Sequence, residues 1–155
     1  MLKHSYFKTK PRKPLKKTKL AKKGKTKISI FKRKLWSVVS KRIKERDKYI
    51  CYTSKVKVSG SNAHCGHGLP SSVCGARLRY HPKNLHCQSY RENVNAGGNG
   101  AIYYQEQVKQ YGQKAVNKLY ALQNKFIDAD ETFYELLTGL YETGTWEDIE
   151  YFLEN

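Results

Sequence analysis

Residues 64–99 read HCGHGLPSSVCGARLRYHPKNLHCQSYRENVNAGGN, and this stretch decides the fold that we expect. Its Gly-, Ser- and Pro-containing part over 66–75 predicts a loop. The residues around 84–88 predict a strand, and 89–96 are predicted as a short helix that ends at the glycine pair 97–98. The stretch is therefore expected to form a strand-containing core followed by a short helix.

Helical and turn patterns extend outward from this stretch in both directions. Upstream, residues 48–58 alternate loosely and predict a strand, which the turn-forming residues 59–62 end. Downstream, Gly112 is expected to cap a helix, and Thr145 with Asp148 resembles a capping box. Apolar residues at helical spacing predict five helices outside the stretch, over 35–47, 102–111, 113–126, 131–142 and 146–154.

Charge is distributed unevenly along this chain of 155 residues, whose net charge is +17. Residues 1–34 contain fifteen Lys and Arg and no acid. This arm is expected to be disordered alone and to bind nucleic acid by releasing counterions, with a localisation or solubility tail as the alternative. Residues 126–155 contain nine acids and no Lys or Arg, and they are either a solvated surface or an internal partner of the arm. We predict three parts: the arm, a central domain over 35–127 and an acidic helical segment over 128–155.

Basic residues next to the central stretch extend the predicted nucleic-acid surface. The helix predicted over 35–47 carries basic residues opposite its apolar stripe. Arg77, Arg79 and Lys83 lie between the two halves of the stretch, where they could hold a phosphate, with a solvated basic loop as the alternative. The predicted nucleic-acid contacts are Lys16, Lys17, Lys22, Lys23, Arg33, Lys34, Arg42, Arg77, Arg79 and Lys83.

Cysteine spacing and hydropathy narrow the class of protein. The four cysteines form no C-x-x-C pair, so an ordinary zinc knuckle is not expected. Disulfides are not expected either, because the chain looks cytosolic. No apolar run is long enough for a membrane span, and the N-terminus lacks the apolar region of a secretory signal. A zinc site with new spacing is an alternative, built from His64, Cys65, His67, Cys74, His81, His86 and Cys87.

The order of polar residues in the central stretch supports a family resemblance. A Gly-His step, an Asn in Asn-Leu-His and an Asn- and Gly-rich segment follow one another as in HNH (ββα-metal) nucleases. From Trp36 to about Leu122 the chain resembles the phage NinG/Rap recombination family, which is related to HNH endonucleases and to Holliday-junction processing. The matching pieces are 44–51, 65–67, 78–88, 93–99 and 111–119. The resemblance implies an α+β fold with a small ββα-metal (HNH-like) hairpin–helix core flanked by helices, to which the disordered basic N-terminal arm is attached.

The resemblance also implies roles for individual residues. His67 is implied as general base and Asn84 as the residue that orients it, and His86 on the same strand is the third predicted catalytic residue. A divalent metal, Mg²⁺ first and Mn²⁺ second, is expected near His67. Its implied ligands are His64, His67, Asn93 and Asn95. Structural zinc is not expected, because the two C-x-x-C knuckles of the family read Cys51–Ser54 and Ser89–Glu92 here.

These implications predict a phage endonuclease that hydrolyses phosphodiester bonds in branched or junction DNA with a divalent metal. It would act in the host-cell cytoplasm, without membrane contact, and a homodimer would supply two sites for one junction. The first alternative is a non-catalytic DNA- or RNA-binding recombination accessory protein on a decayed nuclease scaffold, which the lost knuckle cysteines favour. His67 and Asn84 favour the nuclease. A small RNA-binding protein of ribosomal type is a further alternative, which the acidic C-terminal helices fit poorly.

Overall fold

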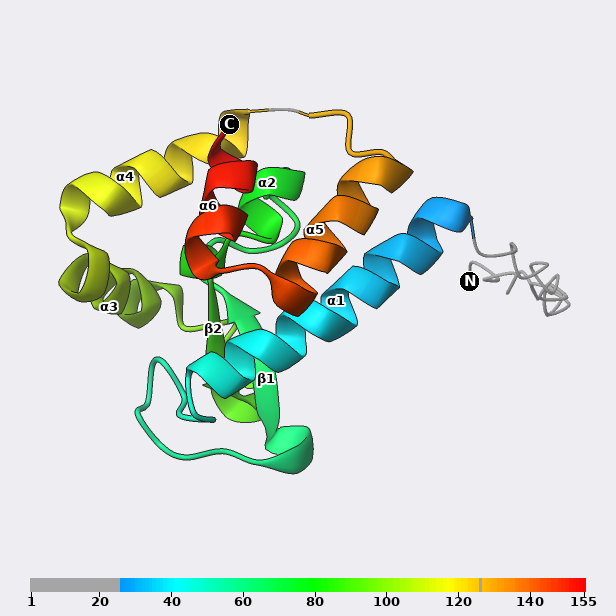
Figure 1. Ribbon diagram of the computed structural model, residues 1–155. Coiled ribbons are helices and arrows are strands. Elements are labelled where there is room, and N and C mark those ends of the chain that lie inside the picture. Colours follow the sequence, from blue (N-terminus) through cyan, green and yellow to red (C-terminus); the bar gives the residue numbers. More distant parts are fainter. Residues whose placement is uncertain (1–25, 126) are drawn as a thin grey trace, which may run out of the picture.

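The longest element, α1 (Lys27–Arg46), runs across the molecule in the computed structural model (Figure 1). The structure describes residues 26–125 and 127–155. The Thr26 side chain caps α1 by accepting a hydrogen bond from the backbone N–H of Ser29 at 3.3 Å. Apolar side chains four residues apart form the buried stripe of the helix, which consists of Leu35, Val39 and Ile43.

The start of α1 differs from the predicted start of its helix, because α1 begins at Lys27 and the prediction begins at residue 35. Residues 27–34 were placed in the arm for their charge, but Lys and Arg are good helix formers and the segment contains neither Gly nor Pro. The predicted boundary after residue 34 therefore lies inside a helix. The predicted disorder of residues 1–25 lies outside the described residues, as do the predicted contacts Lys16, Lys17, Lys22 and Lys23.

The strand over 63–67 and the short helix over 76–79 are not among the predicted elements, and the loop predicted over 66–75 begins inside that strand. The remaining elements follow the predicted order, apart from the strand predicted over 48–58. In chain order the elements after α1 are η1 (Gly60–Asn62), β1 (Ala63–His67), α2 (Ala76–Arg79), η2 (Pro82–Asn84), β2 (Leu85–Ser89), η3 (Arg91–Asn95), α3 (Gly100–Tyr111), α4 (Gln113–Ala121), η4 (Leu122–Asn124), α5 (Glu131–Thr143) and α6 (Trp146–Glu154). Both predicted caps are confirmed. Gly112 follows α3 with a φ of +82°, which glycine adopts without strain. Thr145 and Asp148 form the reciprocal hydrogen bonds of a capping box.

The strand predicted over 48–58 is wrong, and these residues form a tight loop instead. The backbone N–H of Cys51 donates to the carbonyl oxygen of Val56 at 2.8 Å, which closes a turn. A single isolated bridge joins Ile50 to Lys57. The turn uses most of the segment, so the alternating residues have no length left for a pair of strands.

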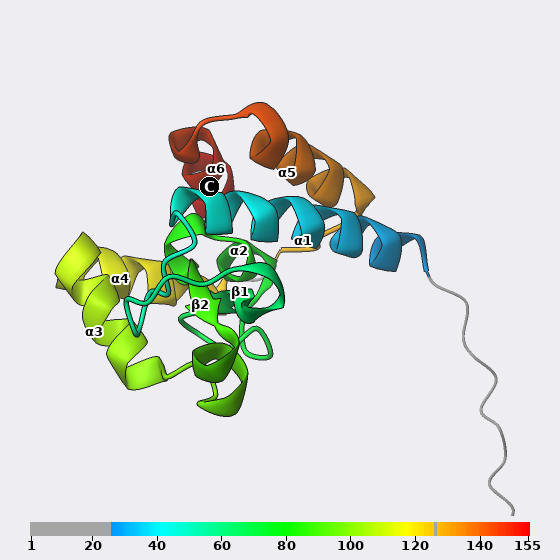
Figure 2. The same cartoon turned by 90° about the horizontal axis from the view of Figure 1, so that it is seen from below.

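β1 and β2 form an antiparallel pair, which confirms the strand predicted around 84–88. Gly66 lies opposite His86, and His67 lies opposite Leu85. Since side chains alternate between the two faces of a strand, His67 and His86 point to opposite faces of the hairpin. Figure 2 shows α1 between the hairpin and the α5–α6 pair, with α3 and α4 beside the hairpin.

The segment after β2 is where the helix of the predicted ββα core should follow the hairpin. The predicted short helix is a single turn of π-helix, Arg91–Asn95, and α3 begins only at Gly100. The chain is therefore mostly helical with one small antiparallel sheet, as expected for the predicted α+β class. The complete ββα-metal arrangement is not confirmed.

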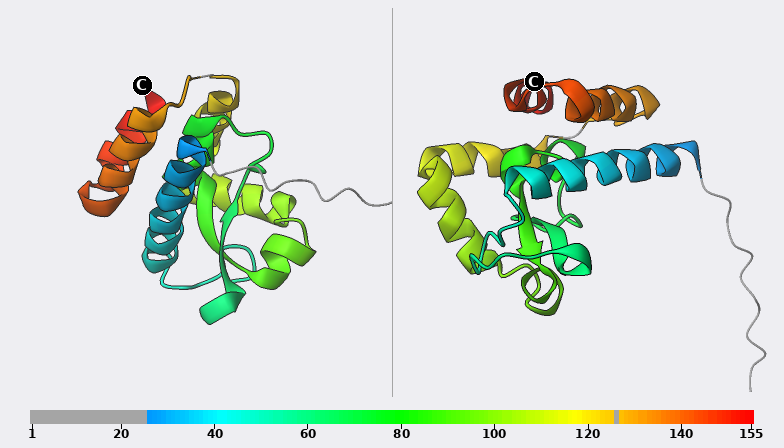
Figure 3. Two further views of the ribbon diagram at one scale, coloured as in Figure 1. Left: turned by 90° about the vertical axis from the view of Figure 1, so that its right-hand side faces the viewer. Right: turned by 60° about the horizontal axis from the view of Figure 1, so that its bottom comes forward.

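The main core joins α1 to α5 and α6, which lie together on one side of the molecule (Figure 3). Its buried members are Leu35, Val39, Ile43, Cys65, Tyr80, Leu85, Tyr134, Leu137, Tyr141, Ile149 and Leu153. The core thus contains residues from both sides of the predicted boundary after residue 127. Within the described ranges, no helix is long and apolar enough to cross a membrane.

Candidate functional site

His67 stands at the end of β1, where its imidazole is held from two sides. Its Nε2 lies 3.2 Å from the carbonyl oxygen of Arg79, so Nε2 donates its proton there. The indole of Trp36, from α1, stacks on the imidazole with ring centroids 5.3 Å apart and planes 6° apart. Among the described residues, none forms a hydrogen bond with Nδ1. The imidazole is therefore held in the tautomer that leaves Nδ1 free to accept a proton.

The protonation state of His67 follows from its surroundings. Burial lowers its pKa to about 4, and the positive charge of Arg79 acts in the same direction. The hydrogen bond to the Arg79 carbonyl opposes this shift but does not reverse it. At neutral pH the imidazole is thus uncharged, as a proton acceptor must be.

A small hollow of about 240 Å³ opens beside His67. It is lined by His67, Gly68, Pro70, Ser71, Asn93, Gly97, Gly98 and Gly100. Gly97 and Gly98 have φ values of +60° and +87°, in the region that favours glycine. The Asn- and Gly-rich segment of the sequence therefore meets His67 in space, as the order of its polar residues predicts.

Gln88 holds this glycine segment in place and was missed by the sequence analysis. Its side-chain amide donates to the carbonyl oxygen of Gly98 at 2.9 Å. A Cβ on Gly66 would lie 1.9 Å from the Gln88 Oε1 atom, so only glycine at this position of β1 leaves room for Gln88. Gln88 is the last residue of the matching piece 78–88, but no local pattern gives it this role, because its partners lie on β1 and in the turn before α3.

The Asn84 side chain does not hydrogen-bond to His67, contrary to the prediction, but supports the site indirectly. Its Oδ1 accepts a hydrogen bond from the backbone N–H of Leu69 at 2.9 Å, and its Nδ2 donates to the carbonyl oxygen of Leu78 at 3.0 Å. Leu69 lies just after β1 and Leu78 lies in α2, so Asn84 holds two parts of the segment between the strands. Leu78 immediately precedes Arg79, whose carbonyl holds His67. Asn84 therefore orients the loop that orients His67.

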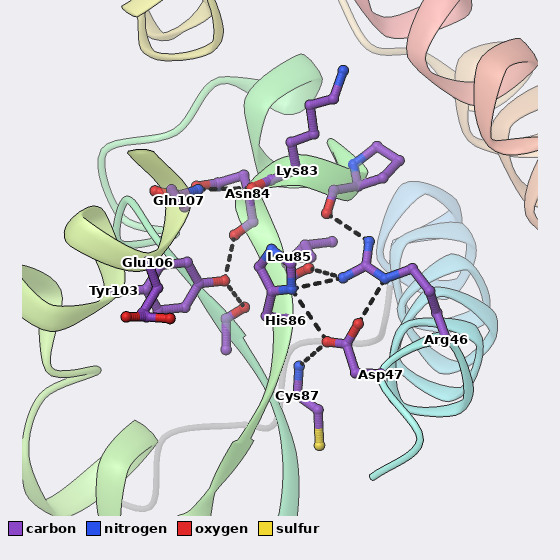
Figure 4. A network of polar contacts seen from close by, with 12 residues as sticks. Arg46, Asp47, Lys83, Asn84, Leu85, His86, Cys87, Tyr103, Glu106 and Gln107 are labelled. Carbon is purple, nitrogen blue, oxygen red and sulfur yellow. Dashed lines mark hydrogen bonds and ion pairs between the residues drawn. The ribbon is translucent and has the colours of Figure 1, made fainter. Parts of the chain in front are cut away.

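His86 lies in a closed polar network on the other face of the hairpin (Figure 4). Its ring stacks on Tyr52 with centroids 3.6 Å apart, and its Nε2 lies 3.1 Å from the Tyr111 hydroxyl. Burial lowers its pKa to about 4. With 2 % of its surface exposed, His86 has no access to substrate, which does not fit its predicted catalytic role. We assign it to the support of the hairpin.

Arg46 and Asp47, at the end of α1, complete this network (Figure 4). The Asp47 carboxylate accepts hydrogen bonds from Arg46 Nε and from the backbone N–H of Cys87, both at 2.7 Å. Arg46 Nη2 donates to the Leu85 carbonyl at 2.7 Å and lies 2.9 Å from His86 Nδ1, which also lies 3.3 Å from the Asp47 carboxylate. Burial opposes ionisation of Asp47, but its hydrogen bonds to His86 and Arg46 outweigh this and lower its pKa to about 2. The pair therefore ties α1 to β2.

The implied metal ligands do not meet as a set. His64 uses both ring nitrogens within the protein: Nε2 lies 3.2 Å from the Ser61 carbonyl, and Nδ1 lies 3.2 Å from the Asn93 amide nitrogen. Asn95 is exposed and does not line the hollow. His67 and Asn93 do share the hollow.

These donors do not fit a resident Mg²⁺ ion. Protein sites for Mg²⁺ are usually built on one or two carboxylates, and no carboxylate lines the described hollow. Across the described residues, no group of three or more His, Cys, Asp and Glu is placed to hold a metal. The alternative zinc site from seven His and Cys residues is therefore not assembled.

The residues at the two knuckle positions lie together without forming four metal ligands. The backbone N–H of Ser89 donates to Cys51 Sγ at 3.2 Å. Thr53, inside the first knuckle position, donates to the Glu92 carboxylate at 3.3 Å. Hydrogen bonds thus join the two segments.

Half of the predicted cations that the structure describes are used inside the protein. Arg42 donates to the carbonyl oxygens at the end of α5, which are those of Leu140, Tyr141 and Gly144. Arg77 donates to the carbonyl oxygen of Asn155 at 3.1 Å, and Lys83 pairs with Glu150 at 2.5 Å. The exposed residues Arg33, Lys34 and Arg79 form no ion pair with another described residue. They are the predicted contacts that stay available for phosphate.

Comparisons with known proteins place the chain in a family. No curated protein and no solved structure matches it. The family model described as bacteriophage Lambda NinG protein matches residues 3–131, which is most of the 155 residues. The match includes β1, β2 and the hollow beside His67, and it ends at the first residue of α5. The chain therefore belongs to the bacteriophage Lambda NinG protein family, which is associated with phage recombination.

Proposed function

We propose that this chain is a recombination endonuclease that hydrolyses phosphodiester bonds in branched or junction DNA, with His67 as general base. The observation that carries the proposal is the neutral imidazole of His67, held through Nε2 and lining a hollow. In hydrolysis, water must lose a proton as it attacks phosphorus, and Nδ1 of His67 is the acceptor.

The low pKa of His67 bears on this chemistry in two ways. A base with a pKa of about 4 is fully deprotonated at neutral pH but accepts protons weakly. A phosphate in the hollow would stabilise the imidazolium and raise the pKa towards the working pH. The base would thus become stronger when substrate is bound.

Nucleic-acid contact would come from cations outside the core. Arg79 is the last residue of α2, and it is exposed and adjacent to His67. Arg33 and Lys34 are exposed on α1. The basic residues before Thr26 would add contacts to phosphate that position the protein without selecting a sequence. A homodimer in the host-cell cytoplasm would bring two hollows to one junction.

Incubation of the protein with labelled duplex, single-stranded and four-way-junction DNA tests the proposal. We expect cleavage of the junction. Parallel reactions with Mg²⁺, Mn²⁺ or EDTA test the predicted metal requirement, because the donors beside His67 do not form a resident Mg²⁺ site. His67→Gly should abolish cleavage, and added imidazole should restore part of it, because it replaces the missing base in the space left by the side chain. Cleavage by His67→Gly without imidazole would contradict the assigned base.

A salt series tests the contact with DNA. Each phosphate neutralised on duplex DNA contributes about 0.9 to the slope of log K against log salt, so loss of around six contacts should flatten the slope by about five units. The comparison requires full-length and 26–155 protein, because removal of residues 1–34 would cut into α1 and delete its Thr26 cap. An unchanged slope would show that residues 1–25 do not contact DNA.

A non-catalytic DNA- or RNA-binding accessory protein is the second candidate. The hydrogen bond between His64 and Asn93 favours it, because two implied metal ligands then hold each other. Tight binding to junction DNA or RNA without cleavage under any metal condition would support this candidate.

A further inference from the structure

The outer face of the α5–α6 pair carries two hollows that no feature of the proposed nuclease uses. They measure about 610 and 520 Å³ and adjoin each other, because both are lined by Leu140 and Phe152. Phe133 lines the larger hollow and Leu136 lines the smaller one. Together they form an apolar groove, which we call the C-terminal groove.

Large apolar side chains stand out from this face. Leu136 is 56 % exposed and Tyr151, which lines the larger hollow, is 73 % exposed. A contiguous apolar surface of this kind on a single chain usually marks an interaction site. The groove lies almost wholly beyond residue 131, where the family match ends. It is therefore an addition to the part of the chain that the family model describes.

The rim of the C-terminal groove is acidic. Asp128, Glu135 and Asp148 line its hollows. Within the described ranges, only Glu150 and Glu154 of the nine acids over 126–155 pair with a Lys or His. Arg77 also lines the larger hollow, but its guanidinium donates to the Leu153 and Asn155 carbonyls. The groove is thus an acidic, apolar surface on a chain whose net charge is +17.

The chain itself supplies a segment with the complementary chemistry. Residues 1–25 contain eleven Lys and Arg, no acid, and scattered large apolar residues such as Phe7, Leu15 and Leu20. Cations of this segment match the acidic rim, and its apolar residues match the floor of the groove. We infer that residues 1–25 dock in the C-terminal groove of the same chain.

The position of Thr26 supports docking within one chain. The Lys32 ammonium lies 5.5 Å from the ring centroid of Tyr134, so the first turns of α1 lie beside the first turns of α5. Figure 1 shows both helices beginning at the same end of the pair. From Thr26, the six residues back to Leu20 can span roughly 20 Å and the eleven back to Leu15 roughly 36 Å. Thr26, to which the segment is attached, therefore lies near the acidic start of α5.

Attachment to α1 also makes weak contacts sufficient. A tethered segment meets its site at an effective concentration of about millimolar, so individually weak ion pairs and apolar contacts add up to an occupied groove. The same lysines cannot hold the groove and a phosphate backbone at once. Nucleic acid would therefore release the segment, and docking would suppress weak, non-specific binding. None of this depends on cleavage by His67.

Carbodiimide cross-linking of the full-length protein tests the inference. This reagent joins Lys to Asp or Glu only in direct contact, and mass spectrometry identifies the joined residues. We expect links from lysines of residues 1–25 to Asp128 and Asp148, which line the larger hollow of the groove. Glu135→Lys should reduce these links roughly fivefold, because it replaces an exposed attraction by a repulsion. Leu136→Gln should also reduce them, because it removes apolar area from the groove.

Glu142→Lys is the matched control. Glu142 is an exposed acid on the same helix, but it lines the hollow between α1 and α5 instead of the C-terminal groove. This variant should keep the links within about twofold. An equal loss in Glu142→Lys and Glu135→Lys would mean that only net charge matters, which overturns the inference.

A mixture of ¹⁴N- and ¹⁵N-labelled protein distinguishes the possible occupants. Links within one label support docking in the same chain. Links between labels would show that the groove holds a second copy, and the absence of links from residues 1–25 would leave the groove to another partner. Either of the last two results overturns the inference.

Discussion

His67 and His86 lie on neighbouring positions of one hairpin, and only one of them has the geometry of a proton acceptor. Burial lowers the pKa of both to about 4. His67 uses one ring nitrogen for the Arg79 carbonyl and lines a hollow. His86 uses both nitrogens, between Arg46 and Tyr111, and is enclosed by aromatic rings.

The comparison shows that the two pKa values do not separate a reactive histidine from a structural one. Both shifts have the same main cause, which is burial. The difference lies in which ring nitrogen is free and whether solvent space adjoins it. The alternation of the strands creates this difference, because it turns one ring to α1 and the hollow and the other to α3.

The largest effect is expected from His67→Ala on the rate of cleavage. Loss of a general base lowers a rate by about 10² to 10⁴, and DNA affinity should change only a few-fold because a neutral side chain is removed. Single-turnover cleavage and equilibrium binding measure the two separately. Undiminished cleavage by this variant would remove the distinction between His67 and His86.

Asp47→Ala should lower the free energy of unfolding more than any substitution of His67, because Asp47 belongs to the buried network around His86. The variant leaves Arg46 without its carboxylate and the Cys87 N–H without its acceptor, which should lower the free energy of unfolding by about 3 kcal/mol. Denaturant titration measures this. Glu45→Ala, which removes an exposed partner of Lys41 on the same helix, is the control and should cost less than about 1 kcal/mol. Equal losses of unfolding free energy in Asp47→Ala and Glu45→Ala would show that the network around His86 does not stabilise the fold.

Stability should fall as the pH falls from about 6.5 to about 4. The folded-state pKa values of His67 and His86 lie below the ordinary value of 6.5, so the unfolded chain binds more protons in this window. The contribution of these histidines to the free energy of unfolding is thus fully present above pH 6.5 and is lost as the pH falls towards 4. Burial also lowers the pKa of His81 to about 4, so denaturant titrations across this range should show uptake of about three protons on unfolding by these three groups. His86→Gln should reduce the uptake by about one.

The smallest effect is expected from His64→Ala. His64 is partly exposed and joins Ser61 to Asn93, so its removal should cost about 1 kcal/mol of stability and change the cleavage rate only a few-fold. Thermal unfolding and single-turnover cleavage measure both. A loss of cleavage comparable to that of His67→Ala would show that His64 contacts the metal, as the family resemblance implies.

Prediction from sequence succeeded where neighbouring residues decide the structure. The helices after residue 100, the Gly112 cap and the Thr145–Asp148 capping box depend on contacts three or four residues apart. It failed over 48–58, where a turn competes with a strand. It also failed at the start of α1, where residues 27–34 were assigned to the basic arm although they favour a helix. The family resemblance implied the role of His67, and the structure places Asn93 and the glycine pair in the same hollow as His67.

The family resemblance implied the α+β class. Local pattern and composition were enough for the second strand of the hairpin, most helix ends and the opposing charges of the two ends of the chain. Only the tertiary structure decided which histidine is free, that Asn84 holds a loop instead of His67, and that α6 occupies Lys83. The physical reason is the range of the interactions. A helix or a cap depends on a few adjacent residues, whereas the state of each histidine depends on atoms from α1, the loop between the strands and α3, which meet only when the chain has folded.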